Sequence, residues 1–360
     1  MEADAAQVPQ KLKAAALAQN GPDIANTWQG MYLTGIKDAV LPLDGKVPQE
    51  DLDNLLGWDY VRLGFKKDGA ILGYPAGSYA LAMLYYNKEI ISKAGLDFEA
   101  SPPKTATDFD AALEKIKAAG FTPIAMDEGQ TKEMLYLIVN YWWGQGAGAE
   151  NLSKHNSGEL KFVDDDGLLN ALSYYQSLYT KGFVNKDAAS STDYINKFYQ
   201  GKAAIVPGGT WGFADVIENM GEKFGIIKPP DVSDKVLIKD AAMGGTGDVF
   251  IVANYTQNAD MAVEFLHFLS SKEESLEWFK ISKSIPIRKD ITPDELGWSN
   301  DPLMSKVLDW SKNTVYWVDN SIDSEAMNEL ATIASLVLTG KMTPKQAAEK
   351  MDAKMAQKVK

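Results

Sequence analysis

The segment FYQGKAAIVPGGTWGFAD, residues 198–215, combines a predicted strand, a glycine-rich break and the start of a helix. The apolar run at 202–206 shows no alternation of polar and apolar residues, which is typical of a strand covered on both faces of a parallel sheet. A Pro-Gly-Gly break follows, and Thr210 can cap a helix that begins at Trp211. The pattern therefore predicts a large aromatic side chain just past the carboxyl end of a strand. Ligands bind at that edge of open α/β sheets. Packing of Trp211 against its own helix is the alternative.

A second informative segment is YPAGSYALAMLYYNKEIISKAGL, residues 74–96. Its pattern predicts a strand over 79–86, a turn at Asn87 and a helix that ends at Gly95. Gly77 and Ser78 have little side-chain bulk, as expected where a chain crosses between two lobes at a hinge.

Both segments resemble the extracellular solute-binding protein family 1, the sugar-binding proteins of ABC importers that include maltose-binding protein. SPPKTATDF (101–109) and SIPIRKD (284–290) are also similar to it, although Ala106 stands where the family usually has Trp. The resemblance implies a two-lobed, type II periplasmic-binding-protein-like α/β fold with a hinge and a cleft. We expect one lobe from 1–76 plus 247–290, and the other from 77–246 plus 291–360.

The same resemblance implies a receptor that captures an oligosaccharide in the cleft by hinge closure. Trp211 corresponds to a family tryptophan that stacks on a sugar ring, and Trp28 occupies the same kind of position after a predicted strand at 24–28. Aromatic side chains would stack on the rings, and carboxylates would accept hydrogen bonds from the hydroxyl groups. The candidate ligand-binding residues are Trp211, Trp28, Tyr79, Trp317, Asp323, Asp248 and Trp142. Trp142 lies in the cluster YWWG at 141–144, where we expect two of the three aromatic residues in the core.

Composition limits the alternatives. With 360 residues the chain is long enough for two lobes, and its net charge of −13 argues against nucleic acid, anionic membranes and polyanionic substrates. The chain has no cysteine, which excludes disulfides, thiol chemistry and cysteine-based zinc sites. Of its two histidines, we expect His155 to be solvated in a polar loop and His267 to pack on a helix. No apolar run reaches 18 residues, so no membrane-spanning helix is expected.

The resemblance also implies partners and location. We expect a carbohydrate ligand, the permease subunits of an ABC transporter, no nucleic acid, no metal and no cofactor. We expect a monomer outside the cytoplasm, either periplasmic or lipid-anchored. Family members usually have a strand and a helix before the segment that corresponds to Gln10, whereas Met1 stands nine residues ahead of it. We therefore expect this βα unit to be missing and the sheet of the N-terminal lobe to expose an edge through which copies can associate.

Two other classes of function remain open. An enzyme of similar architecture, such as a glycosidase, would use paired carboxylates, for which Asp215, Asp248 and Asp323 are candidates. The chain has 49 acidic residues, so such pairs are not specific evidence. A scaffold or adhesin is the third class, and it would bind no small molecule. The resemblance favours a receptor that is not an enzyme.

Overall fold

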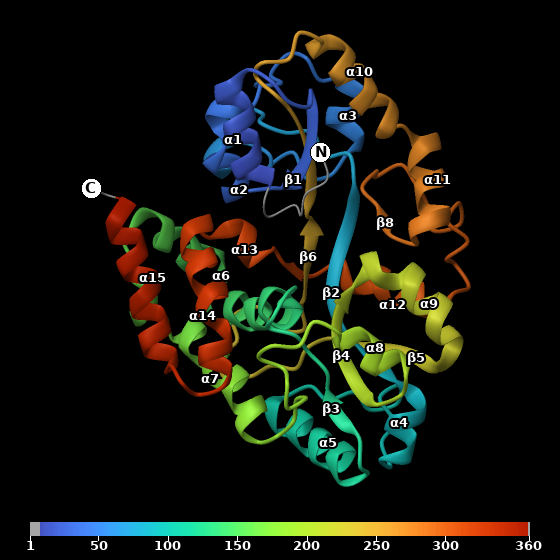
Figure 1. Ribbon diagram of the computed structural model, residues 1–360. Coiled ribbons are helices and arrows are strands. Elements are labelled where there is room, and N and C mark those ends of the chain that lie inside the picture. The colour runs from blue at the N-terminus through green and yellow to red at the C-terminus, as the bar shows by residue number, and fades with distance from the viewer. Residues whose placement is uncertain (1–7, 359–360) are drawn as a thin grey trace. The chain divides into compact units, whose positions relative to one another are not determined.

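The computed structural model describes residues 8–358 and divides into two compact units (Figure 1). Unit 1 comprises Met1–Ala80 and Gly244–Ser305, and unit 2 comprises Leu81–Met243 and Lys306–Lys360. Both units contain helices and strands, and the predicted α/β fold class is confirmed. The chain passes between the units at 80/81, 243/244 and 305/306, whereas the sequence placed these crossings at 76/77, 246/247 and 290/291.

Unit 1 is built on two antiparallel strands, β1 (Ile24–Trp28) and β7 (Asp248–Val252). Ile24 lies opposite Val252 and Trp28 opposite Asp248. The strand predicted at 24–28 is confirmed. The unit's core includes Val249 and Ile251 from β7. The helical segments of this unit are α1 (Val8–Ala18), α2 (Met31–Gly35), η1 (Lys37–Ala39), α3 (Gln49–Asn54), η2 (Leu63–Phe65), α10 (Ala259–Leu269) and α11 (Lys272–Ser282).

Two segments adopt a structure that their local sequence does not indicate. Asp68-Gly69 is a favourable turn pair for a hairpin, yet only a single bridge, between Arg62 and Ile71, forms around it. Gly64 and Phe65 both have positive φ values (65° and 57°), which turn the chain away from the extended conformation of a strand. The glycine-rich segment at 243–247 lies mostly in the buried strand β6 (Ala242–Thr246). β6 pairs with β9 (Thr314–Val315), which lies some 70 residues further along the chain.

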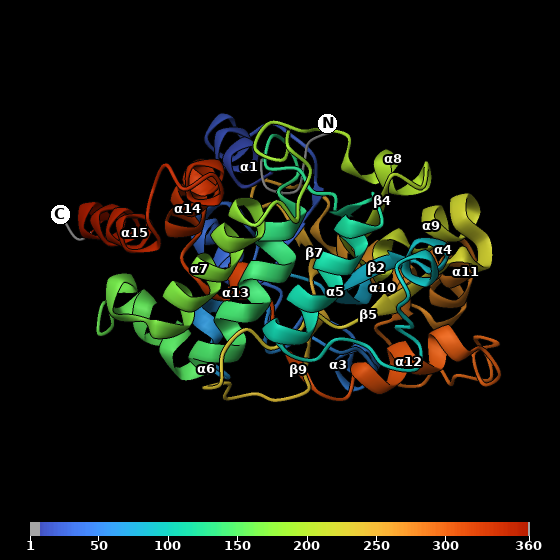
Figure 2. The same cartoon turned by 90° about the horizontal axis from the view of Figure 1, so that it is seen from below.

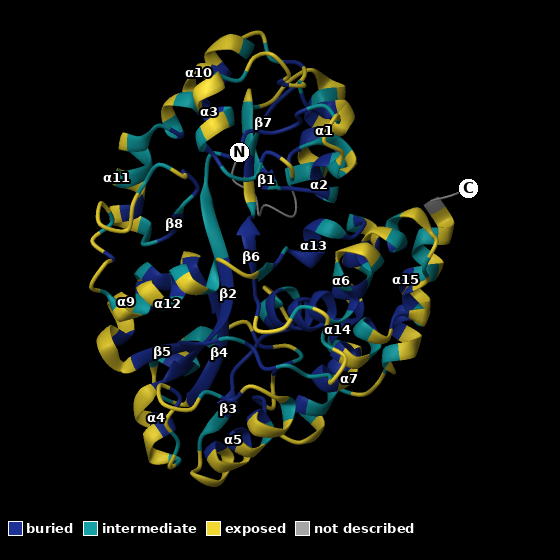
Figure 3. Cartoon of the chain, turned by 180° about the vertical axis from the view of Figure 1, so that it is seen from behind, coloured by how far each residue is buried: buried dark blue, intermediate teal, exposed yellow. Residues whose placement is uncertain are grey.

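Unit 2 is built on four strands of a seven-stranded sheet. β2 (Ser78–Asn87) pairs antiparallel with β4 (Ala203–Gly209) and with β5 (Phe224–Ile227), while β3 (Thr122–Ile124) is parallel to β4. All seven residues of β4 are buried, and β4, β5 and the part of β2 that pairs with them are dark blue in Figure 3. Burial on both faces explains why β4 shows no alternation in its sequence.

Helices cover this sheet, and side chains cap the beginning of two of them. The Asn87 side chain accepts two backbone hydrogen bonds at the start of α4 (Lys88–Lys93), and Thr105 and Asp108 form a capping box at α5 (Ala106–Ala118). α5 packs on β3 (Figure 1), and the last two helices of the chain pack against each other (Figure 2). The remaining segments of unit 2 are η3 (Met134–Val139), α6 (Asn140–Ser157), η4 (Phe162–Asp164), α7 (Asp166–Thr180), α8 (Tyr194–Tyr199), η5 (Thr210–Gly212), α9 (Phe213–Met220), η6 (Gly221–Lys223), α13 (Val318–Ser321), α14 (Ser324–Leu338) and α15 (Pro344–Lys358).

Two further features complete the fold. α12 (Pro302–Trp310) and β8 (Ile285–Pro286) lie in the segment that leads from α11 back to unit 2. Within residues 8–358, none of the helices is both long enough and apolar enough to span a bilayer.

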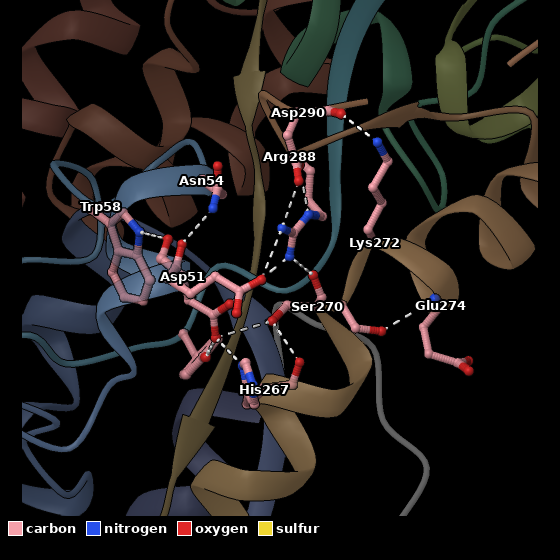
Figure 4. A network of polar contacts seen from close by, with 12 residues as sticks. Asp51, Asn54, Trp58, His267, Ser270, Lys272, Glu274, Arg288 and Asp290 are labelled. Atoms are coloured by element: carbon pink, nitrogen blue, oxygen red, sulfur yellow. Dashed lines mark hydrogen bonds and ion pairs between the residues drawn. The ribbon is translucent and has the colours of Figure 1, made fainter. Parts of the chain in front are cut away.

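A buried polar network holds the helices of unit 1 together (Figure 4). Its centre is Asp51, which is fully buried on α3 and accepts a hydrogen bond from the Tyr74 hydroxyl. Asp51 Oδ2 lies 2.7 Å from His267 Nδ1 and 3.4 Å from Ser270 Oγ. Arg288 lies with Nη1 4.0 Å from Asp51 Oδ1 and donates from the same atom to the Ser270 carbonyl. One carboxylate therefore connects α3, the end of α10 and the segment that follows β8.

Candidate functional site

Trp211 lies on a short 3-10 turn at the carboxyl end of a strand. β4 continues to Gly209, three residues further than predicted, and η5 then leads directly into α9. Thr210 does not cap the helix, contrary to the prediction. Its side chain is buried and accepts a hydrogen bond from the Leu81 backbone N–H at 3.2 Å, because the hydroxyl points toward β2 instead. The Trp211 side chain is 43 % exposed, so it is not packed away against its own helix.

Glycines fix the position of the Trp211 ring. A Cβ atom at Gly209 would collide with that ring. A Cβ atom at Gly208 would lie 2.4 Å from the Tyr85 ring, and one at Gly212 would lie 2.9 Å from the Tyr85 hydroxyl. The buried Tyr85 hydroxyl donates to the Gly209 carbonyl. Tyr85 therefore contacts the backbone of this turn on one side, and the Trp211 indole packs on Gly209. A ring that is held before binding loses little conformational entropy when a ligand stacks on it.

Trp317 is the neighbour of Trp211. Their ring centroids are 6.0 Å apart with an interplanar angle of 56°. Trp317 is only 6 % exposed, and it precedes the four-residue helix α13. Three buried polar atoms in this short segment have no hydrogen-bond partner in the described chain: Trp317 Nε1, Asp319 Oδ1 and Asn320 Oδ1. Buried polar groups are normally paired, so these atoms are available to a ligand or to bound water.

Two carboxyl groups of unit 2, those of Asp319 and Glu133, have raised pKa values. Burial raises the pKa of Asp319 to about 7, although hydrogen bonds from the Asp319 and Asn320 backbone N–H groups oppose the shift. Burial and the neighbouring Asp127 carboxylate raise the pKa of Glu133, which directly precedes η3, to about 7. Burial also raises the pKa of Tyr194, and Glu133 raises it further.

Glu133, Asp319 and Asn320 are not among the candidate residues predicted from the sequence. A signal for Asp319 and Asn320 was present, since both follow Trp317 within three residues in the segment VYWVDN. Glu133 follows the carboxyl end of β3, the edge where α/β sheets bind ligands. Nothing in its local sequence distinguishes it from the other 48 acidic residues, because its position depends on how unit 2 packs.

In unit 1 the structure brings Trp28 and Asp248 together as opposite residues on β1 and β7. Trp28 is half-buried and packs edge-on against Tyr32, with ring centroids 5.1 Å apart. Asp248 is exposed, and its backbone carbonyl accepts a hydrogen bond from the Gln29 side chain. Tyr79 is half-buried on β2, opposite Ile285 of β8. Trp28, Asp248 and Tyr79 are the predicted ligand-binding residues that lie in unit 1.

Two of the predicted ligand-binding residues, Trp142 and Asp323, make contacts within unit 2 that account for their positions. Trp142 is buried, donates its indole N–H to the Pro230 carbonyl at 2.9 Å and packs edge-on against Tyr174. Its two aromatic neighbours, Tyr141 and Trp143, are buried as well, so all three belong to the core of unit 2. The Asp323 carboxylate caps α14 by accepting the Glu325 backbone N–H at 3.0 Å.

A sequence model of the family described as bacterial extracellular solute-binding protein matches residues 1–306 of the chain. The sn-glycerol-3-phosphate-binding periplasmic protein of Yersinia pseudotuberculosis is 27 % identical over 226 residues, which are 61 % of this chain and 50 % of that protein. The protein of the same name from Escherichia coli is 25 % identical over 243 residues, 66 % of this chain and 54 % of its own length. The matches thus span about half the length of these curated relatives.

Solved structures share the fold over almost the whole chain. A chitin oligosaccharide binding protein superimposes with a TM-score of 0.84 at 22 % identity, covering 99 % of this chain and 88 % of its own. An ABC transporter solute binding protein from Thermotoga lettingae, bound with α-D-tagatose, gives a TM-score of 0.78 at 22 % identity, with 98 % and 90 % covered. These similarities establish the two-lobed α/β fold.

Proposed function

Since the chain belongs to the bacterial extracellular solute-binding protein family, we propose that it is the carbohydrate-binding receptor of an ABC importer. The observation that carries this proposal is the Trp211–Trp317 pair, in which one indole is exposed and the other has an unpartnered N–H. Exposed indole faces stack on the apolar faces of sugar rings, and the adjoining Asp319 and Asn320 oxygens accept hydrogen bonds from hydroxyl groups.

The proposal includes a contribution from each unit. Unit 2 supplies Trp211 and Trp317, while Trp28, Asp248 and Tyr79 of unit 1 would contact the same ligand after the hinge closes. The chain passes between the units three times, which supports hinge closure as the mechanism of capture. The ligand is an oligosaccharide, and the closed receptor delivers it to the membrane subunits of the importer. The family is an extracellular one, and we place this receptor in the periplasm or on a lipid anchor.

A role in catalysis is not part of the proposal. The matched family and the similar structures are binding proteins. Of the carboxylates considered for a glycosidase, Asp323 serves as a helix cap and Asp215 is exposed in the first turn of α9. A turnover assay with labelled oligosaccharides at high protein concentration should yield no product, and product formation at a rate above the buffer control would show an enzyme.

We expect a thermal-shift screen to identify the ligand class. The panel should contain di- to hexasaccharides of glucose, xylose, galactose, glucosamine and N-acetylglucosamine, together with sn-glycerol 3-phosphate. A ligand present at 100 times its Kd stabilises the folded state by about 2.7 kcal/mol, which raises the melting temperature by several degrees. At least one oligosaccharide should produce this shift. A shift with sn-glycerol 3-phosphate alone would contradict the proposal, and no shift with any compound would favour a scaffold.

A further inference from the structure

Tyr85 packs directly against the turn that carries Trp211. It lies on β2 and is only 2 % exposed. Its ring packs among aromatic neighbours, with centroids 6.1 Å from that of Phe213 and 6.0 Å from that of Phe224. Its hydroxyl donates a hydrogen bond to the Gly209 carbonyl. The phenol thus connects the core of unit 2 to the backbone two residues before the exposed indole.

The glycines of this turn make room for two aromatic rings. Gly208, Gly209 and Gly212 do not belong to the glycines with positive φ values, so the backbone conformation does not require glycine at these positions. A Cβ atom at Gly208 or Gly212 would lie within 3.0 Å of Tyr85, and a Cβ atom at Gly209 would collide with the Trp211 ring. Close packing of the two rings therefore explains the glycines.

A second hydrogen bond from β2 holds the same turn. The Thr210 side chain is fully buried and accepts the Leu81 backbone N–H at 3.2 Å. β2 therefore binds both residues that precede Trp211, one through its carbonyl and the other through its hydroxyl. Because the Trp211 side chain is 43 % exposed, its orientation depends strongly on the backbone that carries it.

We propose that Tyr85 is a positioning residue of the carbohydrate site, which holds the Trp211 indole in the orientation that stacks on a sugar ring. This inference rests on the proposed function. Tyr85 is buried and acts through the turn, without touching the sugar. If its hydroxyl is removed, the Gly209 carbonyl loses a partner and the indole samples more orientations. Binding must then order the ring, which lowers the affinity.

Fluorine NMR on the ligand-free protein measures the effect on Trp211 directly. The chain has nine tryptophans, and incorporation of 5-fluorotryptophan gives a resonance for each of them. Trp211→Phe identifies the resonance of Trp211. Tyr85→Phe keeps the aromatic ring and removes only the hydroxyl. We expect the Trp211 resonance to shift or broaden in this variant, while the resonances of unit 1 tryptophans, such as Trp278, stay in place.

Tyr86→Phe is the matched control. Tyr86 is the next residue on β2, is 1 % exposed and donates its hydroxyl to the Glu99 carboxylate at 2.5 Å. Alternation along the strand directs the two tyrosines to opposite faces of the sheet. Each substitution removes one hydrogen bond, so both variants should lose a similar few degrees of melting temperature. Only Tyr85→Phe should change the Trp211 resonance.

Isothermal titration calorimetry measures the affinity for the panel oligosaccharide that raises the melting temperature most. Tyr85→Phe should raise its Kd about 2- to 10-fold, as expected for ordering one side chain on binding. Tyr86→Phe should stay within about twofold of the native protein. Gly209→Ala displaces the indole in a second way, because the added Cβ would collide with the ring while the extended backbone (φ −162°) suits alanine. It should raise the Kd about 10-fold or more.

The outcomes separate this inference from the proposed function. A changed Trp211 resonance and a raised Kd in Tyr85→Phe, both absent in Tyr86→Phe, support the positioning role. If Tyr85→Phe leaves either the resonance or the Kd unchanged, that role is overturned and the receptor function stands. Equal changes in both tyrosine variants also overturn it, since general destabilisation then explains them. If no panel oligosaccharide binds the native protein, the receptor function and the positioning role are both overturned.

Discussion

Replacing Trp211 with alanine is expected to weaken carbohydrate binding by about 30- to 1,000-fold while the protein remains folded. A buried aromatic anchor in a binding site typically contributes on the order of 2–4 kcal/mol, which corresponds to this range of Kd. Because 43 % of the side chain is exposed, its removal leaves no large core cavity. The melting temperature without ligand should therefore fall by only a few degrees. Affinity and melting temperature are measured on the same preparation.

Trp278→Ala is the matched control for this experiment. Trp278 lies on α11 of unit 1 and is 58 % exposed, so its loss removes a similar side chain away from the candidate site. Affinity should stay within about twofold of the native protein, the range expected for surface changes of up to about 0.5 kcal/mol. If Trp211→Ala instead collapses stability by about 3–5 kcal/mol and the folded fraction binds normally, Trp211 is a packing residue.

The largest effect on stability is expected for Asp51→Asn. The carboxylate is fully buried and receives donors from Tyr74, His267 and Ser270, with Arg288 beside it. The amide removes the negative charge and directs N–H groups toward other donors. Breaking a buried ionic network by removing one partner typically costs about 3–5 kcal/mol. Chemical denaturation of the 360-residue chain measures the free energy of unfolding of the variant and of the native protein.

Glu50→Gln provides the comparison. Glu50 is the preceding residue and also lies near Arg288, with Oε1 3.6 Å from Nη2, but its side chain is 64 % exposed. Solvated ion pairs of this kind contribute about 0–1 kcal/mol. The two substitutions should thus differ by more than about 2 kcal/mol. Similar losses in both variants would show that burial of Asp51 does not determine the strength of the network.

Local sequence signals predicted the elements of this fold well. The turn predicted at Asn87 is formed and caps α4, because its hydrogen bonds reach only two or three residues along the chain. The strand at 24–28 was also predicted correctly. Strand pairing was not predictable in the same way. The partner of β6 is β9, and no local pattern in the glycine-rich segment at 243–247 indicates that pairing.

Burial of polar residues was the least predictable feature. His155 was expected to be solvated in a loop, whereas it is buried on α6, stacks on Phe162 and lies with Nε2 2.8 Å from Asp165 Oδ2. The polar neighbours of His155 in the sequence gave the wrong prediction, since its burial comes from packing against a segment several residues away. The local sequence likewise does not indicate the surroundings of Asp51, Glu133 and Asp319. Their environments arise from tertiary packing. By contrast, the position of Trp211 just past the end of a strand could be predicted from the local sequence.

The most direct test of the receptor proposal is a crystal structure with the oligosaccharide that raises the melting temperature most. The account predicts a sugar ring stacked on the Trp211 indole at van der Waals distance, about 3.5–4 Å, with ligand atoms bonded to the Trp317 N–H and the Asp319 carboxylate. A complex in which the sugar binds elsewhere, and in which Trp211 contacts only protein or solvent, would contradict it.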